Sequence, residues 1–231
     1  SRASNLKPFV IYAFDGNQKS PVTDLDHLPA DKQLVAVIGL VLEDMANISP
    51  NVGKLRFAKE VASAQATVDL LQARGIQRIV ALTHIGNARD LALAAKVNGL
   101  DAIVGGHSHS QLGDFRNIGW GKTGEYAQLV TNPDGVGLTC VVQAGSSAQA
   151  IGLTRVSFDA QGRVIACKGQ NQLLGSRDFF ADPARQQVLD ETRSQQAGKF
   201  IDAQPNLVTV DEDPRLRGII DSHYKPALEQ A

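Results

Sequence analysis

Residues 78–109 read RIVALTHIGNARDLALAAKVNGLDAIVGGHSH. Two short apolar runs, at 78–83 and 101–104, flank a stretch that is rich in alanine and leucine. Apolar runs of this length predict buried strands, and the stretch between them predicts a helix over 87–97 with Asn87 as its N-cap. A strand, a helix and a second strand in this order are typical of a parallel sheet that is covered by helices.

The same alternation extends toward the N-terminus. The run LVAVIGL at 34–40 predicts another buried strand, and apolar positions recur at helical spacing from about 58 to 74. Residues 1–34 contain several prolines and aspartates and are expected to be irregular. The fold class that follows is α/β, with a largely parallel sheet.

The second half of the chain has a different character. Residues 110–134 contain four glycines and the only tryptophan, so they predict a long loop. β-rich stretches and then helices follow, and residues 159–162 have the composition of a hairpin turn. The expected strands are 138–144, 151–158 and 163–169, and the expected helices are 184–197 and 215–228.

Three of the five histidines stand at the ends of predicted strands. His84 closes the first apolar run of the opening stretch, and His107 and His109 follow a Gly-Gly pair after the second run. Ligands collect at the carboxyl ends of the strands in open α/β sheets, glycines permit close backbone approach, and neutral imidazole is the commonest metal ligand. The pattern therefore predicts part of a metal site.

Other interpretations of these histidines stay open at this point. A histidine at a strand end can be a structural hydrogen-bonding residue, and a His-x-His pair on a strand can simply face solvent. The remaining two histidines lack such a context. His27 lies in a loop rich in aspartate and His223 in a helical stretch near Pro226, so both are expected at the surface.

Length, composition and charge limit the classes of function. The 231 residues are enough for one large domain, or for a domain with an appendage, and 43% hydrophobic residues suffice for a packed core. A net charge of −1 gives no electrostatic reason to expect nucleic acid or an anionic membrane as a partner. No apolar run approaches the roughly 18 residues of a membrane-spanning helix.

Two motifs carry a resemblance to a known family. The segments LTHIG at 82–86 and DAIVGGHSH at 101–109 resemble the closing motifs of the calcineurin-like metallophosphoesterases, and among these the secreted 5′-nucleotidases. VVQAG at 141–145, IGL at 151–153 and the hairpin VSFDAQGRV at 156–164 strengthen the narrower resemblance. The chain is most similar to bacterial periplasmic 5′-nucleotidases, including those that also cleave NAD.

The resemblance covers most of the chain, from about Gln33 onward, and it implies a fold. Residues 1–175 would be a partial metallophosphoesterase domain, which is half of a four-layer αββα sandwich. Residues 176–231 would be a helical connecting segment whose C-terminal helices lead toward a missing second domain. The expected location is periplasmic or secreted.

The resemblance also implies two divalent metal ions, such as zinc or manganese, in the complete enzyme. His84 and His107 would ligate one ion and His109 the other. Family members hold the remaining ligands in an early Asp-x-His, a Gly-Asp and a Gly-Asn-His motif, all of which would precede the part of the protein seen here. The general acid also belongs to that absent N-terminal half, so no catalytic residue is assigned in this chain.

A nucleotide substrate is expected for the complete enzyme, and the chain alone is expected to be inactive. Its partners would be the N-terminal half and the C-terminal domain of the same protein. An alternative function is a non-catalytic metal-binding or interaction module derived from a metallophosphoesterase, with residues 110–134 as a contact surface. The sequence does not decide which nucleotide is cleaved.

The chain contains two cysteines, Cys140 and Cys167. Free cysteines often behave as small buried hydrophobic residues, so an even count alone does not establish a bond. The resemblance to periplasmic enzymes makes a Cys140–Cys167 disulfide a specific hypothesis, because disulfides persist in oxidising compartments.

Overall fold

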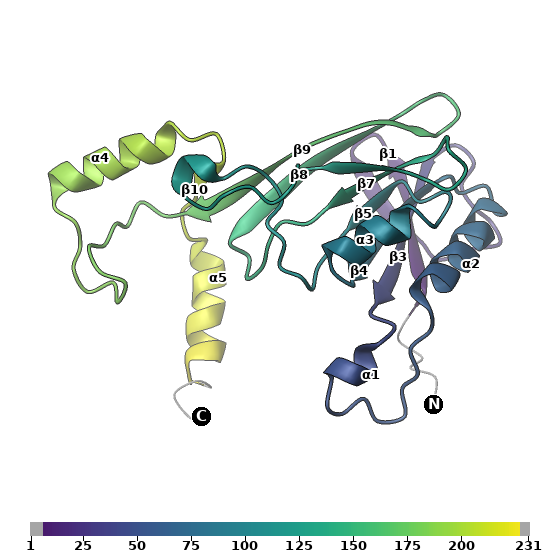
Figure 1. Cartoon of the computed structure of the whole chain (residues 1–231), viewed down its shortest axis with the longest axis horizontal. Coiled ribbons are helices and arrows are strands. Elements are labelled where there is room, and N and C mark those ends of the chain that lie inside the picture. The colour runs from purple at the N-terminus through teal and green to yellow at the C-terminus, as the bar shows by residue number, and fades with distance from the viewer. Residues whose placement is uncertain (1–6, 227–231) are drawn as a thin grey trace. The chain divides into compact units, whose positions relative to one another are not determined.

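The computed structural model describes residues 7–226, and Figure 1 shows the order of their helices and strands. Internal contacts divide the chain into two units, the first ending at Asn171 and the second starting at Gln172. This division precedes the boundary at residue 175 that the sequence suggested. Each unit is described by itself below.

A mixed sheet forms the centre of the first unit, and in the described residues its order is β2-β1-β3-β4-β5-β7-β6. The inner strands β3, β4, β5 and β7 run parallel, whereas the outer pairings of β1 with β2 and β3, and of β6 with β7, are antiparallel. The strands are β1 Phe9–Asp15, β2 Gln18–Val22, β3 Gln33–Val41, β4 Arg78–His84, β5 Ala102–Val104, β6 Gln128–Thr131 and β7 Leu138–Val142. The predicted α/β class and the side-by-side arrangement of the inner strands are confirmed.

The outer strands contradict two of the sequence-based predictions. The N-terminal segment is not irregular over its described part, because β1 and β2 form a hairpin there. Residues 110–134 are not one long loop either, because they contain the short 3₁₀ helix η1 (Arg116–Ile118) and strand β6. Strands β2 and β6 are short and largely exposed, so their sequences lack the continuous apolar signal of the inner strands. Strand β1 does carry such a signal, the apolar run FVIYAF at 9–14, which was not predicted as a strand.

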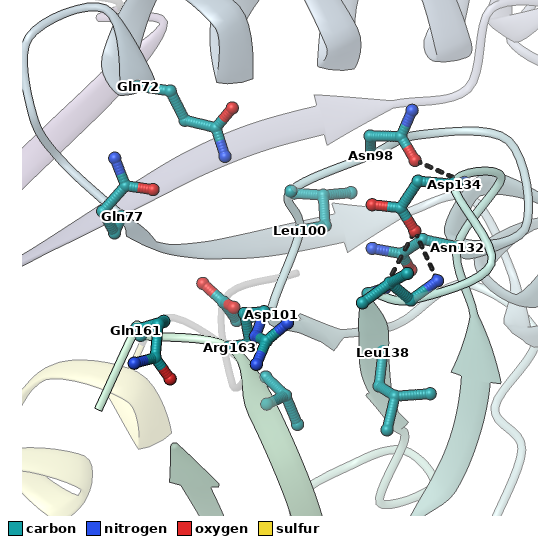
Figure 2. A pocket seen from close by; sticks show the side chains of 15 residues that line it. Gln72, Gln77, Asn98, Leu100, Asp101, Asn132, Asp134, Leu138, Gln161 and Arg163 are labelled. Atoms are coloured by element: carbon teal, nitrogen blue, oxygen red, sulfur yellow. Dashed lines mark hydrogen bonds between the residues drawn. The ribbon is translucent and has the colours of Figure 1, made fainter. Parts of the chain in front are cut away.

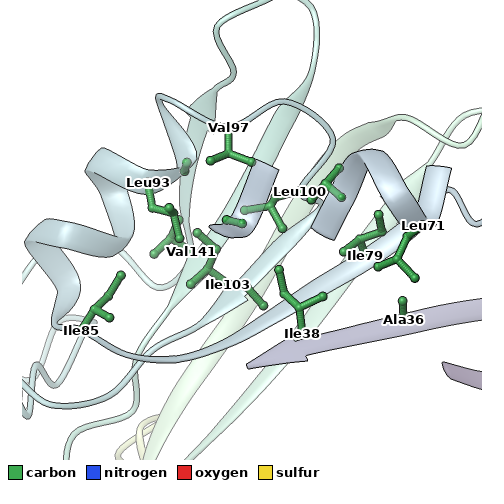
Figure 3. Packing of buried hydrophobic residues seen from close by; sticks show 14 of the residues in the cluster. Ala36, Ile38, Leu71, Ile79, Ile85, Leu93, Val97, Leu100, Ile103 and Val141 are labelled. Carbon is green, nitrogen blue, oxygen red and sulfur yellow. The ribbon is translucent and has the colours of Figure 1, made fainter. Parts of the chain in front are cut away.

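Two helices, α2 (Glu60–Gln72) and α3 (Asn87–Ala94), cover one face of the sheet, and the four-residue helix α1 (Met45–Ile48) follows β3. Figure 3 shows the core between these helices and the strands, where Leu71 and Leu93 pack near Ile38, Ile79 and Ile103. All five side chains are 1% exposed or less. Burial of one such side chain stabilises the fold by about 1.5–3 kcal/mol, so this layer fixes the strand ends that carry the histidines.

Helix α3 begins differently from the prediction. Gly86, not Asn87, is its N-cap, and Asn87 is the first helical residue. Gly86 has φ 94°, a left-handed conformation that glycine adopts without the steric cost of a side chain. Gly86 has no side chain with which to cap the helix, and Ser108 Oγ instead accepts a hydrogen bond from Asn87 N–H at 3.0 Å. The N-cap role predicted for Asn87 is therefore wrong.

A hairpin of β8 (Ala150–Phe158) and β9 (Val164–Gly175) follows. The carboxylate of Asp159 accepts hydrogen bonds from the N–H groups of Gln161 (2.9 Å) and Arg163 (2.8 Å), which forms the predicted turn. Cys167 and Val156 pack against Ala102, Cys140 and Val142 on the face of the sheet opposite α2 and α3.

A disulfide joins Cys140 to Cys167, whose Cα atoms lie 5.9 Å apart. The disulfide hypothesis is therefore confirmed. Cys140 lies on the inner strand β7 and is fully buried, whereas Cys167 lies on β9. The bond holds the hairpin covalently against the sheet.

The second unit contains helices α4 (Glu191–Asp202) and α5 (Pro214–Ile219), the π-helical turn η2 (Ile220–Tyr224) and the short strand β10 (Leu207–Thr209). The end of β9 pairs with β10 in parallel. Asp190 and Asp213 cap α4 and α5 by accepting hydrogen bonds from backbone N–H groups of their first turns.

The second unit is thus not entirely helical, in contrast to the expectation for 176–231. The helix predicted from residue 184 starts later because the Asp182 carboxylate accepts bonds from the N–H groups of Gln186 and Gln187, which bends the chain into a turn. The end of the helix predicted to residue 228 lies outside the described residues. Within residues 7–226, no helix has the length and apolar character needed to cross a membrane.

Candidate metal centre

The parallel pairing of β4 and β5 brings two of the predicted histidines together. His84 is the last residue of β4, and His107 follows β5 in the adjacent turn. Their ring centroids lie 5.0 Å apart with an angle of 70° between the ring planes. Both residues are exposed. The predicted juxtaposition is confirmed, and the metal role stays a prediction.

The turn after β5 has an unusual backbone. His107 has φ 77° and His109 has φ 54°, in the left-handed region that residues with side chains seldom adopt. Gly106 lies directly against His84, since a Cβ at this position would be 3.2 Å from His84 Nδ1. Left-handed residues of this kind concentrate at functional sites, where the surrounding structure holds them in place.

His109 is placed differently from the other two. It is exposed in the same turn, but it does not complete a cluster with His84 and His107. In the part of the chain that the structure describes, no group of three or more His, Cys, Asp or Glu side chains gathers closely enough to hold a metal ion. The chain therefore brings two of the three predicted ligands together and not the third.

Gln143, directly after the inner strand β7, also contacts this turn. Its Nε2 donates to the Gly106 carbonyl (3.1 Å), and its Oε1 accepts from Ser110 N–H and from Ser108 Oγ (3.0 Å). The side chain is only 2% exposed. Sequence reasoning used Gln143 only as part of a family motif. The available signal was its place near the end of the predicted strand 138–144, whose counterpart β7 runs parallel to β5.

Asp90 of α3 approaches the same region from the helix that covers the sheet. Its Oδ1 accepts a hydrogen bond from Thr83 Oγ1 at 2.6 Å, next to His84 in the sequence. Its buried Oδ2 has no hydrogen-bond partner among the described residues, and a Cβ on Gly105 would lie 2.1 Å from it. Burial raises the pKa of Asp90 to about 6, with a further contribution from the charge of Glu60, although the Thr83 hydrogen bond lowers it.

An ion-pair network fixes the loop after β3. Glu43 and Glu60 exchange backbone-to-carboxylate hydrogen bonds of 3.0 Å. Arg89 of α3 binds Glu60 at 3.0 Å and Asp44 at 2.7 Å. The positive charge of Arg89 compensates the negative charges of the neighbouring carboxylates. The cluster thereby joins α2, α3 and the β3–α1 loop.

A separate cavity of about 200 Å³ lies at the opposite, amino-terminal ends of the parallel strands. Figure 2 shows its polar lining, which includes Gln72, Gln77, Asp101 and Arg163. Asp101 accepts a 2.7 Å hydrogen bond from Ile79 N–H, and burial raises its pKa to about 7. The carboxyl group thus joins the starts of β4 and β5, far from the histidine edge of the sheet.

The remaining histidines lie at the surface, as predicted. The His27 side chain is 86% exposed, and its Nδ1 lies 2.9 Å from Asp24 Oδ2. His223 is exposed in η2 of the second unit.

Comparison with known proteins identifies relatives that are nucleotidases or nucleotide phosphoesterases. No protein-family model matches the chain. The trifunctional nucleotide phosphoesterase protein of Bacillus subtilis is 34% identical over 170 residues, which cover 73% of this chain and 11% of that protein. Human 5′-nucleotidase is 32% identical over 183 residues, covering 75% of this chain and 31% of that protein.

Two solved structures are also similar. The 5′-nucleotidase precursor of Thermus thermophilus aligns with a TM-score of 0.58 and 34% identity, over 74% of this chain and 32% of that one. The NAD nucleotidase of Haemophilus influenzae aligns with a TM-score of 0.79 over all of this chain and 44% of that one. Its identity of 23% supports the fold alone.

The chain spans about a third or less of the length of these two curated relatives. The sequence matches include 5′-nucleotidases and a nucleotide phosphoesterase, and the structural alignments agree with the observed α/β fold. The chain belongs to the 5′-nucleotidase family.

Proposed function

We propose that the protein containing this chain is a metal-dependent phosphoester hydrolase that acts on nucleotides, and that this chain contributes histidine ligands to a pair of divalent ions. The observation that carries the proposal is the pairing of His84 and His107, 5.0 Å apart at the carboxyl edge of the sheet. In an open α/β sheet this edge is the usual place for a ligand.

The residues present suit such an ion as part of a ligand set. Imidazole nitrogens suit zinc and manganese, and Gly106 leaves the space beside His84 Nδ1 free of a side chain. In the proposed assignment His84 and His107 bind one ion and His109 the other. When bound, such ions polarise the phosphoryl group and activate a water molecule.

The donor set of the described residues is incomplete, because no three candidate ligands cluster. A catalytic zinc ordinarily has three protein ligands. The other ligands and the general acid are therefore proposed to come from the N-terminal half of the same protein. The chain alone is expected to be inactive.

The exposed face of the sheet supports this choice of partner. Leu82 is 57% exposed and Val104 is 42% exposed, although both lie on inner strands. Val41 is 52% exposed and is the register partner of His84. Because alternate residues of a strand share a face, this apolar surface continues to His84. A segment that packs on it would also lie beside the histidines and complete the metal site.

The Cys140–Cys167 disulfide supports a periplasmic or secreted location for the protein. A further domain of the same protein is proposed to bind the nucleotide base. Neither nucleic acid nor a membrane is proposed as a partner.

The proposal is tested by assaying the full-length protein against AMP, a UDP-sugar, NAD and a 2′,3′-cyclic nucleotide, with Mn²⁺ or Zn²⁺ added. We expect hydrolysis of at least one substrate, its loss on chelation and its recovery on return of the metal. Hydrolysis that is insensitive to chelation would contradict metal dependence. Metal binding without hydrolysis of any of the four would instead support a non-catalytic metal-binding or interaction module.

A further inference from the structure

We infer that Gln143 is a positioning residue that holds the turn carrying His107 and His109 in its ligand-presenting conformation. The inference rests on the proposed function for the identity of the ligand. The role of the Gln143 side chain is argued from the geometry of its hydrogen bonds.

Three hydrogen bonds of the Gln143 amide bracket both histidines. The bond to the Gly106 carbonyl precedes His107, the bond to Ser108 Oγ lies between the histidines, and the bond from Ser110 N–H follows His109. The orientation of the amide is forced by chemistry. A backbone carbonyl can only accept and a backbone N–H can only donate, so Nε2 must face Gly106 and Oε1 must face Ser110.

The backbone of this turn requires such support. His107 and His109 both have positive φ, which costs conformational free energy for residues with a Cβ. Such a conformation persists when surrounding bonds over-determine it. The amide fixes the backbone before, between and after the two histidines, so it supplies this constraint.

The same amide connects the turn to the other candidate ligand. Ser108 Oγ donates to Gln143 Oε1 and accepts from Asn87 N–H at 3.0 Å. Asn87 begins the helix that follows the His84 turn. One hydroxyl thus joins the His107 turn to the chain just after His84, and Gln143 anchors that hydroxyl to the end of β7.

Burial makes the arrangement specific. Gln143 is 2% exposed, so water cannot replace the bonds of its amide. A buried polar network whose members are all satisfied has one preferred geometry, whereas a partly satisfied one does not. Side chains that orient metal ligands through hydrogen bonds typically change metal affinity 10- to 100-fold when they are replaced.

Two variants of the full-length protein test the inference. Gln143→Met keeps the volume of the side chain and loses all three bonds, whereas Gln143→Glu keeps the acceptor toward Ser108 and Ser110 and loses the donor to Gly106. We expect affinity for Mn²⁺ or Zn²⁺ to fall about 10- to 100-fold in Gln143→Met and less in Gln143→Glu. In the metal-free protein, amide hydrogen exchange at Ser110 should accelerate in Gln143→Met.

The readouts separate positioning from general stability. Thr139→Val is the matched control, because it removes a buried hydroxyl bonded to the Leu100 carbonyl and Asn132 at the other edge of the sheet. This control should lower the unfolding temperature without changing metal affinity. Saturating metal should restore activity to Gln143→Met, since its ligands remain, but not to His107→Ala.

The outcomes distinguish this inference from the proposed function. Unchanged metal affinity in His107→Ala would contradict the proposed metal site. Weakened binding in His107→Ala, with wild-type affinity and wild-type Ser110 exchange in Gln143→Met, would overturn the positioning role. If Gln143→Met does not fold, Gln143→Glu decides, and wild-type metal affinity in that variant would likewise overturn it.

Discussion

The free energy of unfolding should decrease as pH rises, and the substitution Asp101→Asn should make this decrease smaller. Asp101 is 7% exposed, and burial raises its pKa to about 7 from an ordinary 3.8, although the Ile79 N–H and Arg78 act to lower it. One pKa unit corresponds to about 1.4 kcal/mol. The ionised carboxylate should therefore lower the free energy of unfolding by about 4 kcal/mol at pH 8, as an order of magnitude.

The sign follows from proton binding. Between about pH 4 and pH 7 the folded protein keeps the proton on Asp101, whereas the unfolded chain has released it. The folded state is thus favoured at low pH and loses this advantage as pH rises through the folded pKa. Asparagine has no charge to bury, and its side-chain oxygen can still accept the hydrogen bond from Ile79 N–H.

Urea unfolding followed by circular dichroism at pH 5 and pH 8 measures the effect. The wild type should lose more free energy of unfolding between these pH values than Asp101→Asn. A smaller decrease should remain in the variant, because burial also raises the pKa of Asp90, to about 6. Asp134→Asn is the control, since backbone hydrogen bonds lower the pKa of this exposed carboxyl group. Equal pH dependence in the wild type and Asp101→Asn would refute the reasoning.

In the full-length protein, His107→Ala should lower phosphoesterase turnover roughly 100-fold or more, whereas His27→Ala should leave it unchanged; equal activity of the two variants would show that the His107 turn is only structural. The double change Cys140→Ser and Cys167→Ser should lower the free energy of unfolding by about 3 kcal/mol in a denaturant titration, because the bond closes a loop with a sequence separation of 27. Gly105→Ala should destabilise the fold by about 1–3 kcal/mol, because its Cβ would lie 2.1 Å from a buried carboxylate oxygen. An unchanged midpoint for Gly105→Ala would contradict that packing.

The sequence by itself determined the inner sheet, the helices that cover it and the edge at which the histidines lie. Strands β3, β4 and β5 were predictable because each is an apolar run buried on at least one face, which is a local signal. The edge followed from topology, since parallel strands end together. The family followed from the histidine motifs and their neighbours, and the relatives agree with it.

Tertiary structure decided which side chains and which strands come into contact. The 5.0 Å separation of the His84 and His107 rings depends on the register of two strands that are separated by a helix. The outer strands β2 and β6 become strands through hydrogen bonds with partners elsewhere in the sheet, so their own composition predicts little, whereas the apolar run of β1 carried a local signal that was not used.

The polar interior likewise depended on the fold. The bonds of Gln143 join the end of β7 to a turn more than thirty residues away. The raised pKa values of Asp90 and Asp101 arise from burial, which exists only after helices and strands pack. Periodicity along a chain reports which faces are apolar, whereas burial and hydrogen bonding of a polar group depend on residues distant in sequence.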